Sequence, residues 1–208
     1  MNKIILSLSF FFCFTLSAFS STKAVVNFIE GDVTIDGLPA KVGQVITLGS
    51  VVKAADDAKI DITLVKDVRA RLIGGKVSIT SLGEKPKLNL KYGKLYSQIR
   101  RPVEYKIETP HGTAGVRGTQ FLYEVQLEKE KDYVCVCEGS VSVIRKGSDT
   151  AQIVKAGEDL WLKKAGPLKE PVFSPDMNSM TKKIFADMAS KIAKVPSYKR
   201  RNFRSAGR

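Results

Sequence analysis

Short apolar segments in which hydrophobic and polar residues alternate follow one another from Ala24 to Lys164. In Ile60–Leu64 and Val68–Leu72 every second residue is apolar, so each segment has one face for a core and one for solvent. Glycines and the pairs Asp56-Asp57 and Lys66-Asp67 separate the segments at intervals of roughly 8–12 residues, as in antiparallel sandwiches and barrels. The sequence therefore predicts an all-β domain, an antiparallel β-sandwich or β-roll of many short strands. The expected strands are Val25–Ile29, Val33–Ile35, Val51–Lys53, Ile60–Leu64, Val68–Leu72, Val77–Ile79, Leu88–Leu90, Leu95–Ile99, Val103–Ile107, Phe121–Leu127, Tyr133–Cys137, Val141–Ile144, Ile153–Lys155 and Leu160–Leu162.

A short module, Gly-x-(Val/Leu), recurs at Gly31, Gly75, Gly93 and Gly139. The spacing between its copies is not constant, so the sequence does not establish a regular solenoid repeat. A stacked β-roll stays open as an alternative to a sandwich.

The stretch Thr109–Phe121, TPHGTAGVRGTQF, interrupts two alternating runs, Val103–Glu108 and Phe121–Leu127. It holds a proline and three glycines, and glycine is placed where the backbone bends sharply or another strand approaches closely. We therefore expect one strand to enter a tight, glycine-built corner and a second strand to leave it. His111, within this turn, is expected to be a surface residue.

This stretch, with the later Val134–Val141, resembles the signature of the FecR domain family, in which a Thr-Pro-x-Gly element leads into Val-Arg-Gly-Thr-x-Phe and then into a Glu-Gly strand pair. The resemblance covers roughly residues 26–164. The residues that carry it, which we interpret as structural, are Thr109, Pro110, Gly112, Val116, Arg117, Gly118, Thr119, Phe121, Glu138 and Gly139.

The N-terminus has the layout of a secretory signal peptide. Lys3 precedes an apolar run from Ile4 to Phe19, and small residues occupy the cleavage positions near Ser20. Residues 1–20 are therefore expected to be removed after export, which places the protein in the periplasm or at the cell surface. An uncleaved anchor and lipidation at Cys13 are the alternatives; the run is short for a bilayer span of about 20 residues, and bulky residues precede the cysteine.

Cys135 and Cys137 are separated by one residue on an expected strand, so both side chains lie on the same face. We interpret them as small residues packed on that strand. A strained or intermolecular disulfide and a metal site remain alternatives.

The pattern changes after Lys164. Residues 165–173 read as a proline-containing linker, and Ser174 is a candidate N-cap with Pro175 at the first helical position. Residues 174–195 are predicted to form one amphipathic helix, and its apolar face is expected to dock on an open edge or end of the β domain. Its apolar stripe is Met177, Met180, Ile184, Met188, Ile192 and Val195.

Most of the net charge of +13 lies in the C-terminal part of the chain. Residues 163–208 hold 12 Lys or Arg and 3 Asp or Glu, a balance of +9. Residues 196–208 are expected to be a disordered basic tail that is either solvated or held on an anionic lipid or polymer. The candidate contacts are Lys199, Arg200, Arg201 and Arg204. Nucleic acid is not an expected partner of an exported chain.

No catalytic pattern is found. The glycine stretch joins strand to strand and lacks the Gly-Lys-Ser/Thr of a phosphate loop, and His111 has no nucleophile elbow beside it. We expect no enzyme activity, no cofactor and no metal. Arg117 is predicted to brace the corner by pairing with Glu138 or with loop carbonyls, and Trp161 is interpreted as a core residue, with a sugar-stacking role as the alternative.

The resemblance to the FecR family implies an extracytoplasmic domain that mediates protein–protein contacts, in signal relay or as a scaffold. Its best-known members span the membrane, control a sigma factor inside the cell and receive a signal from an outer-membrane receptor. This chain has no segment that matches the cytoplasmic part, so the expectation is a contact with another envelope protein, by strand addition at a sheet edge. The alternative is a structural protein held on an envelope polymer or anionic lipid by its tail.

Overall fold

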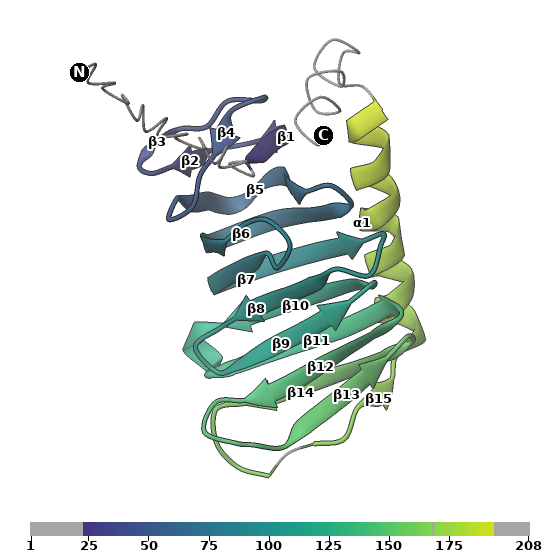
Figure 1. Cartoon of the computed structure of the whole chain (residues 1–208). Coiled ribbons are helices and arrows are strands. Elements are labelled where there is room, and N and C mark those ends of the chain that lie inside the picture. The colour runs from purple at the N-terminus through teal and green to yellow at the C-terminus, as the bar shows by residue number, and fades with distance from the viewer. Residues whose placement is uncertain (1–22, 168, 194–208) are drawn as a thin grey trace, which may run out of the picture.

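The chain folds into a β-roll with one helix along its side (Figure 1). The computed structural model describes residues 23–167 and 169–193, and within them one continuous 15-stranded sheet curls back on itself. The all-β prediction with one C-terminal helix is confirmed. The strands are β1 (Ala24–Glu30), β2 (Val33–Ile35), β3 (Leu38–Pro39), β4 (Val45–Ile46), β5 (Val51–Val65), β6 (Val68–Ser81), β7 (Lys87–Ile99), β8 (Glu104–Glu108), β9 (Gly112–Arg117), β10 (Gln120–Gln126), β11 (Lys131–Glu138), β12 (Ser140–Arg145), β13 (Ala151–Lys155), β14 (Glu158–Lys163) and β15 (Val172–Phe173); the helices are the 3-10 turn η1 (Leu127–Lys129) and α1 (Pro175–Ala193).

The three long strands β5, β6 and β7 bend in the middle and thereby create two layers. The second half of β7 pairs with β10, whereas its first half pairs in parallel with β8. The strands β1, β10, β11, β14 and β15 continue one layer, which we call the helix layer, and β2, β3, β8, β9, β12 and β13 continue the other, the open layer. One apolar core, with Leu90, Leu95, Tyr105 and Phe121 fully buried, lies between them.

The sequence predicts two short strands in each of these long ones, because Asp56-Asp57 interrupts the alternation in β5 and glycines interrupt it in β6 and β7. The structure shows that the glycines mark bends, not ends. A Cβ on Gly75 would lie 2.3 Å from the Tyr92 carbonyl oxygen, and one on Gly93 would lie 2.2 Å from the Gly74 carbonyl oxygen. The two strands can therefore bend side by side only because both positions lack a side chain.

The bends of β5, β6 and β7 form one wall of the roll. The opposite wall is a stack of turns that connect the two layers. Gly118, at φ +73°, links β9 to β10, and Gly139, at φ +78°, links β11 to β12. A Cβ on Gly139 would lie 2.7 Å from the Gly118 carbonyl oxygen, and the Gly139 carbonyl accepts a hydrogen bond from Ala156 N–H at 3.0 Å. The recurring glycine module thus marks two walls, with Gly75 and Gly93 in one and Gly139 in the other.

Helix α1 lies across the outer face of the helix layer, where it contacts β1, β7, β10 and β11 (Figure 1). Phe185 and Met188 are buried against a second apolar cluster on that face, which includes Tyr96, Leu122 and Tyr133. The prediction that the helix docks on an edge or end is therefore wrong.

The buried side of α1 also differs from the predicted stripe. Met180 is 57% exposed, whereas Phe185, outside that stripe, is buried. The helix begins at Pro175, and β15 lies inside the predicted linker at residues 165–173. The side chains of Met177 and Ile192, together with Val195, lie outside the described residues, as do the signal peptide (1–20) and the basic tail (196–208).

Candidate interaction site

The Thr-Pro-His-Gly element forms a hydrogen-bond network between the two layers. We call this network of Thr109, His111, Gly112, Tyr123 and Asp132 the polar lock. The Thr109 hydroxyl lies 2.6 Å from Asp132 Oδ2 and accepts a hydrogen bond from Gly112 N–H at 2.9 Å. The Tyr123 hydroxyl donates to the same Asp132 oxygen at 2.9 Å, and His111 Nδ1 lies 2.6 Å from Asp132 Oδ1. These bonds connect the β8–β9 turn of the open layer with β10 and β11 of the helix layer.

The lock is closed to solvent. Asp132 and Tyr123 are fully buried and His111 is 5% exposed, so the prediction that His111 is a surface residue is wrong. Burial raises the pKa of the Asp132 carboxyl, against the opposing effect of the hydrogen bonds from Thr109, His111 and Tyr123. Burial, with the nearby Asp132 charge, also raises the pKa of Tyr123 well above its ordinary value. Sequence reasoning missed Asp132 because it follows a run of charged residues, 128–131, that reads as an exposed turn.

The other family-motif residues have structural positions as well. Val116 and Phe121 belong to the core, and a Cβ on Gly112 would lie 2.6 Å from the Ile144 carbonyl oxygen. Thr119 is buried next to Gly139. The half-buried Pro110 lies in the turn that carries the lock.

Arg117 does not brace a corner. It lies exposed at the end of β9, opposite Glu104 of β8, and the ion pairs of the described residues include none between Arg117 and the exposed Glu138. The expected corner is itself largely a strand, β9, whose alternation turns the Arg117 side chain away from the core.

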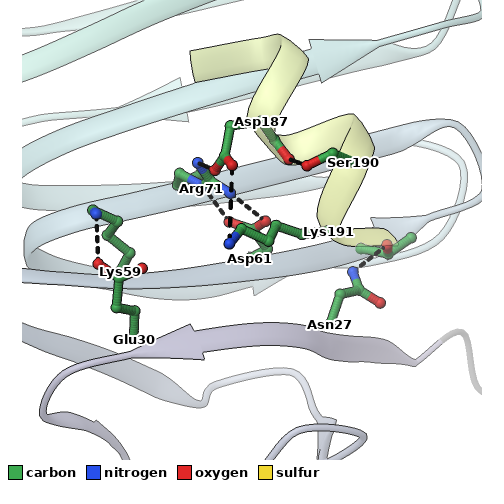
Figure 2. Close-up of polar contacts among 9 residues, drawn as sticks. Asn27, Glu30, Lys59, Asp61, Arg71, Asp187, Ser190 and Lys191 are labelled. Carbon is green, nitrogen blue, oxygen red and sulfur yellow. Dashed lines mark hydrogen bonds and ion pairs between the residues drawn. The ribbon is translucent and has the colours of Figure 1, made fainter. Parts of the chain in front are cut away.

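A buried ion cluster fastens α1 to the sheet (Figure 2). Arg71, only 1% exposed, donates to both Asp61 oxygens at 2.5 and 2.8 Å and to Asp187 Oδ2 at 2.6 Å. Burial raises the pKa of Asp61, while for Arg71 the hydrogen bonds to Asp61 and Asp187 outweigh desolvation and raise its pKa. Lys191 and Arg71 also lie over the Phe28 ring, 4.7 and 5.7 Å from its centroid.

Sequence reasoning missed this cluster. Asp61 and Arg71 occupy the polar positions of two alternating strands and therefore read as solvent-exposed. The available signal was their opposite charge on neighbouring strands, since Asp61 and Arg71 are direct partners in the β5–β6 register.

The two thiols lie beneath α1. Cys135 and Cys137 are buried on the outer face of β11, in the cluster that includes Phe185. Both side chains are packed in this cluster, as the packing interpretation predicts. The Cys137 thiol donates a hydrogen bond that lowers the pKa of Cys135, and the same bond, with burial, raises the pKa of Cys137.

Trp161 lies half-buried beside the two thiols. Its ring centroid is 4.6 Å from that of Tyr133, and Lys131 Nζ lies 3.8 Å above the indole. The indole thus belongs to the layer between helix and sheet, and not to the core between the two β layers.

Exposed apolar side chains gather at the two ends of the roll, which are the candidate interaction site. Nearly all of the large exposed hydrophobic residues in the described part of the chain fall in one of two groups. The end of the roll that contains β3 and β4 carries Leu38, Val42, Val45 and Leu48. The opposite end, which contains β12, β13 and β15, carries Ile144, Ile153, Val172 and Phe173.

The second end also has a groove of about 540 Å³, which we call the end groove. It lies between the beginning of α1 and the turn that follows β13. Its lining includes Cys137, Gly157, Phe173, Pro175, Lys182 and Lys183. The candidate tail contacts Lys199, Arg200, Arg201 and Arg204 lie outside the described residues. In the part of the chain that the structure describes, no helix has both the length and the hydrophobicity of a membrane span.

Comparison with known proteins finds one family model that matches part of the chain. Residues 49–142 match the family model described as FecR protein, which confirms the resemblance seen in the sequence. Two crystal structures described as a "putative anti-sigma factor" from Parabacteroides distasonis ATCC 8503 are similar to the chain, with TM-scores of 0.49 and sequence identities of 14% and 15%. Each match covers 59% of this chain and 57% of the solved chain, so this chain spans less than two thirds of those proteins. No curated protein matches the sequence significantly.

Proposed function

Since the chain carries a FecR domain, we propose that it is an exported, non-enzymatic protein whose β-roll binds another protein of the cell envelope, in signal relay or as a scaffold. The proposal includes removal of residues 1–20 as a signal peptide, which would leave the roll in the periplasm or at the cell surface.

The observation that carries this proposal is the gathering of exposed apolar residues at the two ends. Val172 and Phe173 are 62% and 71% exposed on a terminal strand, and Leu38 is 70% exposed at the other end. Exposed apolar patches on soluble proteins are typical of protein-binding surfaces. The family-motif residues, in contrast, are mostly engaged in the lock, the turns and the core.

Site-specific photo-cross-linking in the native envelope tests the proposal. A photoreactive phenylalanine analogue would replace Leu48 at one end, Phe173 at the other, or Arg69 on a strand in the middle of the sheet. We expect one discrete protein adduct from an end position and none from position 69. Absence of a protein adduct from both ends, with the protein correctly exported, would refute the proposal.

A second function rests on the charge of the C-terminal part, which is +9 over residues 163–208. In this alternative the tail binds anionic lipid or polymer and the roll is a structural body. Flotation with vesicles of phosphatidylglycerol and phosphatidylethanolamine would compare the full chain with a chain that ends at Ala193. Binding that depends on residues 194–208 and is lost between 50 and 300 mM salt, roughly, would favour this function, because exposed charges are screened over about 8–10 Å at moderate salt.

A cut at Gly166 is not a suitable control for that experiment. It would also remove α1 and expose Tyr96, Leu122 and the two thiols, which the helix now covers. Any change in binding could then come from the new apolar surface.

A further inference from the structure

The end groove lies beside β15, the edge strand of the helix layer. β15 pairs with β14 through Asp159–Val172 and Glu158–Phe173, and it is the last strand of the helix layer. Ser174 N–H donates to the Gly157 carbonyl at 2.9 Å, so Ser174 and, by alternation, Val172 direct their backbone groups toward β14. The N–H and C=O of Phe173 consequently point away from the sheet, where an added strand would bind them.

The lining of the groove defines what fits there. Phe173, Pro175, Gly157 and Cys137 provide an apolar wall, and among the described residues of the lining Lys182 and Lys183 are the charged ones. Both lysines are exposed on α1. The groove therefore suits an apolar side chain followed by a carboxylate.

We infer that the end groove binds an extended segment of a partner protein, in which apolar and acidic residues alternate, as an additional strand on β15. The apolar side chain would lie against Phe173, and the carboxylate would contact Lys182 or Lys183. This inference rests on the proposed function and specifies its partner chemistry.

A second copy of this chain is the less favourable occupant. Pairing of β15 with β15 about a twofold axis would bring Lys182 and Lys183 of both copies to the same interface. Like charges at short distance disfavour such a contact.

Fluorescence anisotropy with three labelled peptides of roughly eight residues, a common strand length, tests the inference on the full chain. The first peptide alternates valine with aspartate or glutamate, and the second has lysine in place of each acid. The third repeats the first with N-methyl groups at alternate residues, which removes the donors for strand pairing. We expect the acidic peptide to bind about tenfold or more tightly than either of the others.

Three variants locate the site. In Lys182→Glu/Lys183→Glu the preference should reverse toward the lysine peptide, and Phe173→Ser should lose binding. Leu127→Ser removes another exposed apolar side chain, 45% exposed and distant from β15, and should bind like the original protein.

Equal affinity for the acidic and lysine peptides, or a preference that survives the charge reversal, would overturn the inference. A dimer in sedimentation that Phe173→Ser abolishes, without peptide binding, would identify a second copy as the occupant and overturn it as well. Adducts from position 48 in the envelope are independent of this groove. If they persist while the peptides fail, the inference is wrong and the proposed function stands.

Discussion

Arg71 on β6 and Asp187 on α1 are 116 positions apart in the sequence, and Arg71 Nη1 lies 2.6 Å from Asp187 Oδ2. The same guanidinium holds both oxygens of Asp61, so one buried cation connects two strands and the helix. This contact fixes the C-terminal half of α1 on the sheet, while Phe185 and Met188 supply its apolar contact.

Arg71→Met is expected to lower the free energy of unfolding by about 3–5 kcal/mol, because it leaves the Asp61 carboxylate buried without a partner. Asp187→Asn should lower the free energy of unfolding by less, since the Asp187 side chain is 46% exposed and the ion pair between Asp61 and Arg71 remains. Urea denaturation measures both. Lys59→Met, which removes an exposed pair with Glu30, is the control and should leave the midpoint unchanged. Equal effects of all three variants would contradict a specific role for the buried cluster.

Thr109→Val should destabilise the protein by about 1–3 kcal/mol, because Asp132 loses a donor and Gly112 N–H loses its acceptor while both stay buried. Thermal unfolding followed by circular dichroism measures the change. Thr113→Val, at a half-buried position of the adjoining strand, is the matched control. If the two valine variants have the same melting temperature, the lock contributes nothing to stability.

The stability difference between the original protein and Asp132→Asn should depend on pH. Burial raises the pKa of Asp132 above its ordinary value of 3.8, so the folded state binds the proton more tightly than the unfolded state. As pH rises from about 3.8 through the raised folded pKa, the original protein should lose stability relative to Asp132→Asn, by at most about 1.4 kcal/mol per pH unit. Urea titrations across this range measure the slope; a difference that increases with pH would contradict the direction.

Gly75→Ala should be strongly destabilising, because its Cβ would lie 2.3 Å from the Tyr92 carbonyl oxygen at the bend of β6 and β7. The atoms nearest to that Cβ all belong to the backbone of Tyr92 and Gly93, so the clash can be relieved only if the two strands move apart. We expect the free energy of unfolding to fall by roughly 3 kcal/mol, or the protein to misfold. Soluble yield and urea midpoint check this. Gly115→Ala is the control, since nothing lies within 4 Å of its Cβ and its φ is not positive.

Phe185→Ala should accelerate alkylation of Cys135 and Cys137 without global unfolding, because Phe185 holds α1 over both thiols. Iodoacetamide labelling under native conditions, read by mass spectrometry of the peptide that carries the pair, gives the rate. Met180→Ala, at an exposed position on the same helix, should leave the rate unchanged.

Local periodicity explains why much of the fold could be predicted. The alternation in Ile60–Leu64 and Val68–Leu72 depends only on neighbouring residues, and both segments are strands. Cys135 and Cys137 share a face for the same reason. Where glycine breaks the alternation the prediction is wrong. The sequence predicts a tight corner at Gly112–Arg117, whereas this segment is the strand β9, in which a Cβ on Gly115 would meet no atom within 4 Å.

By itself the sequence determined the class of the fold, the resemblance to the FecR family model and the beginning of α1 at Pro175, because each of these depends on short-range pattern and turn chemistry. Only the tertiary structure decided that β6 and β7 run through both layers, that His111 is buried against Asp132, and that α1 lies on the sheet face through Arg71. These features depend on which distant segments become neighbours. A buried charge and a solvated one look identical in the sequence, and only the packing around Arg71 and Asp132 distinguishes them.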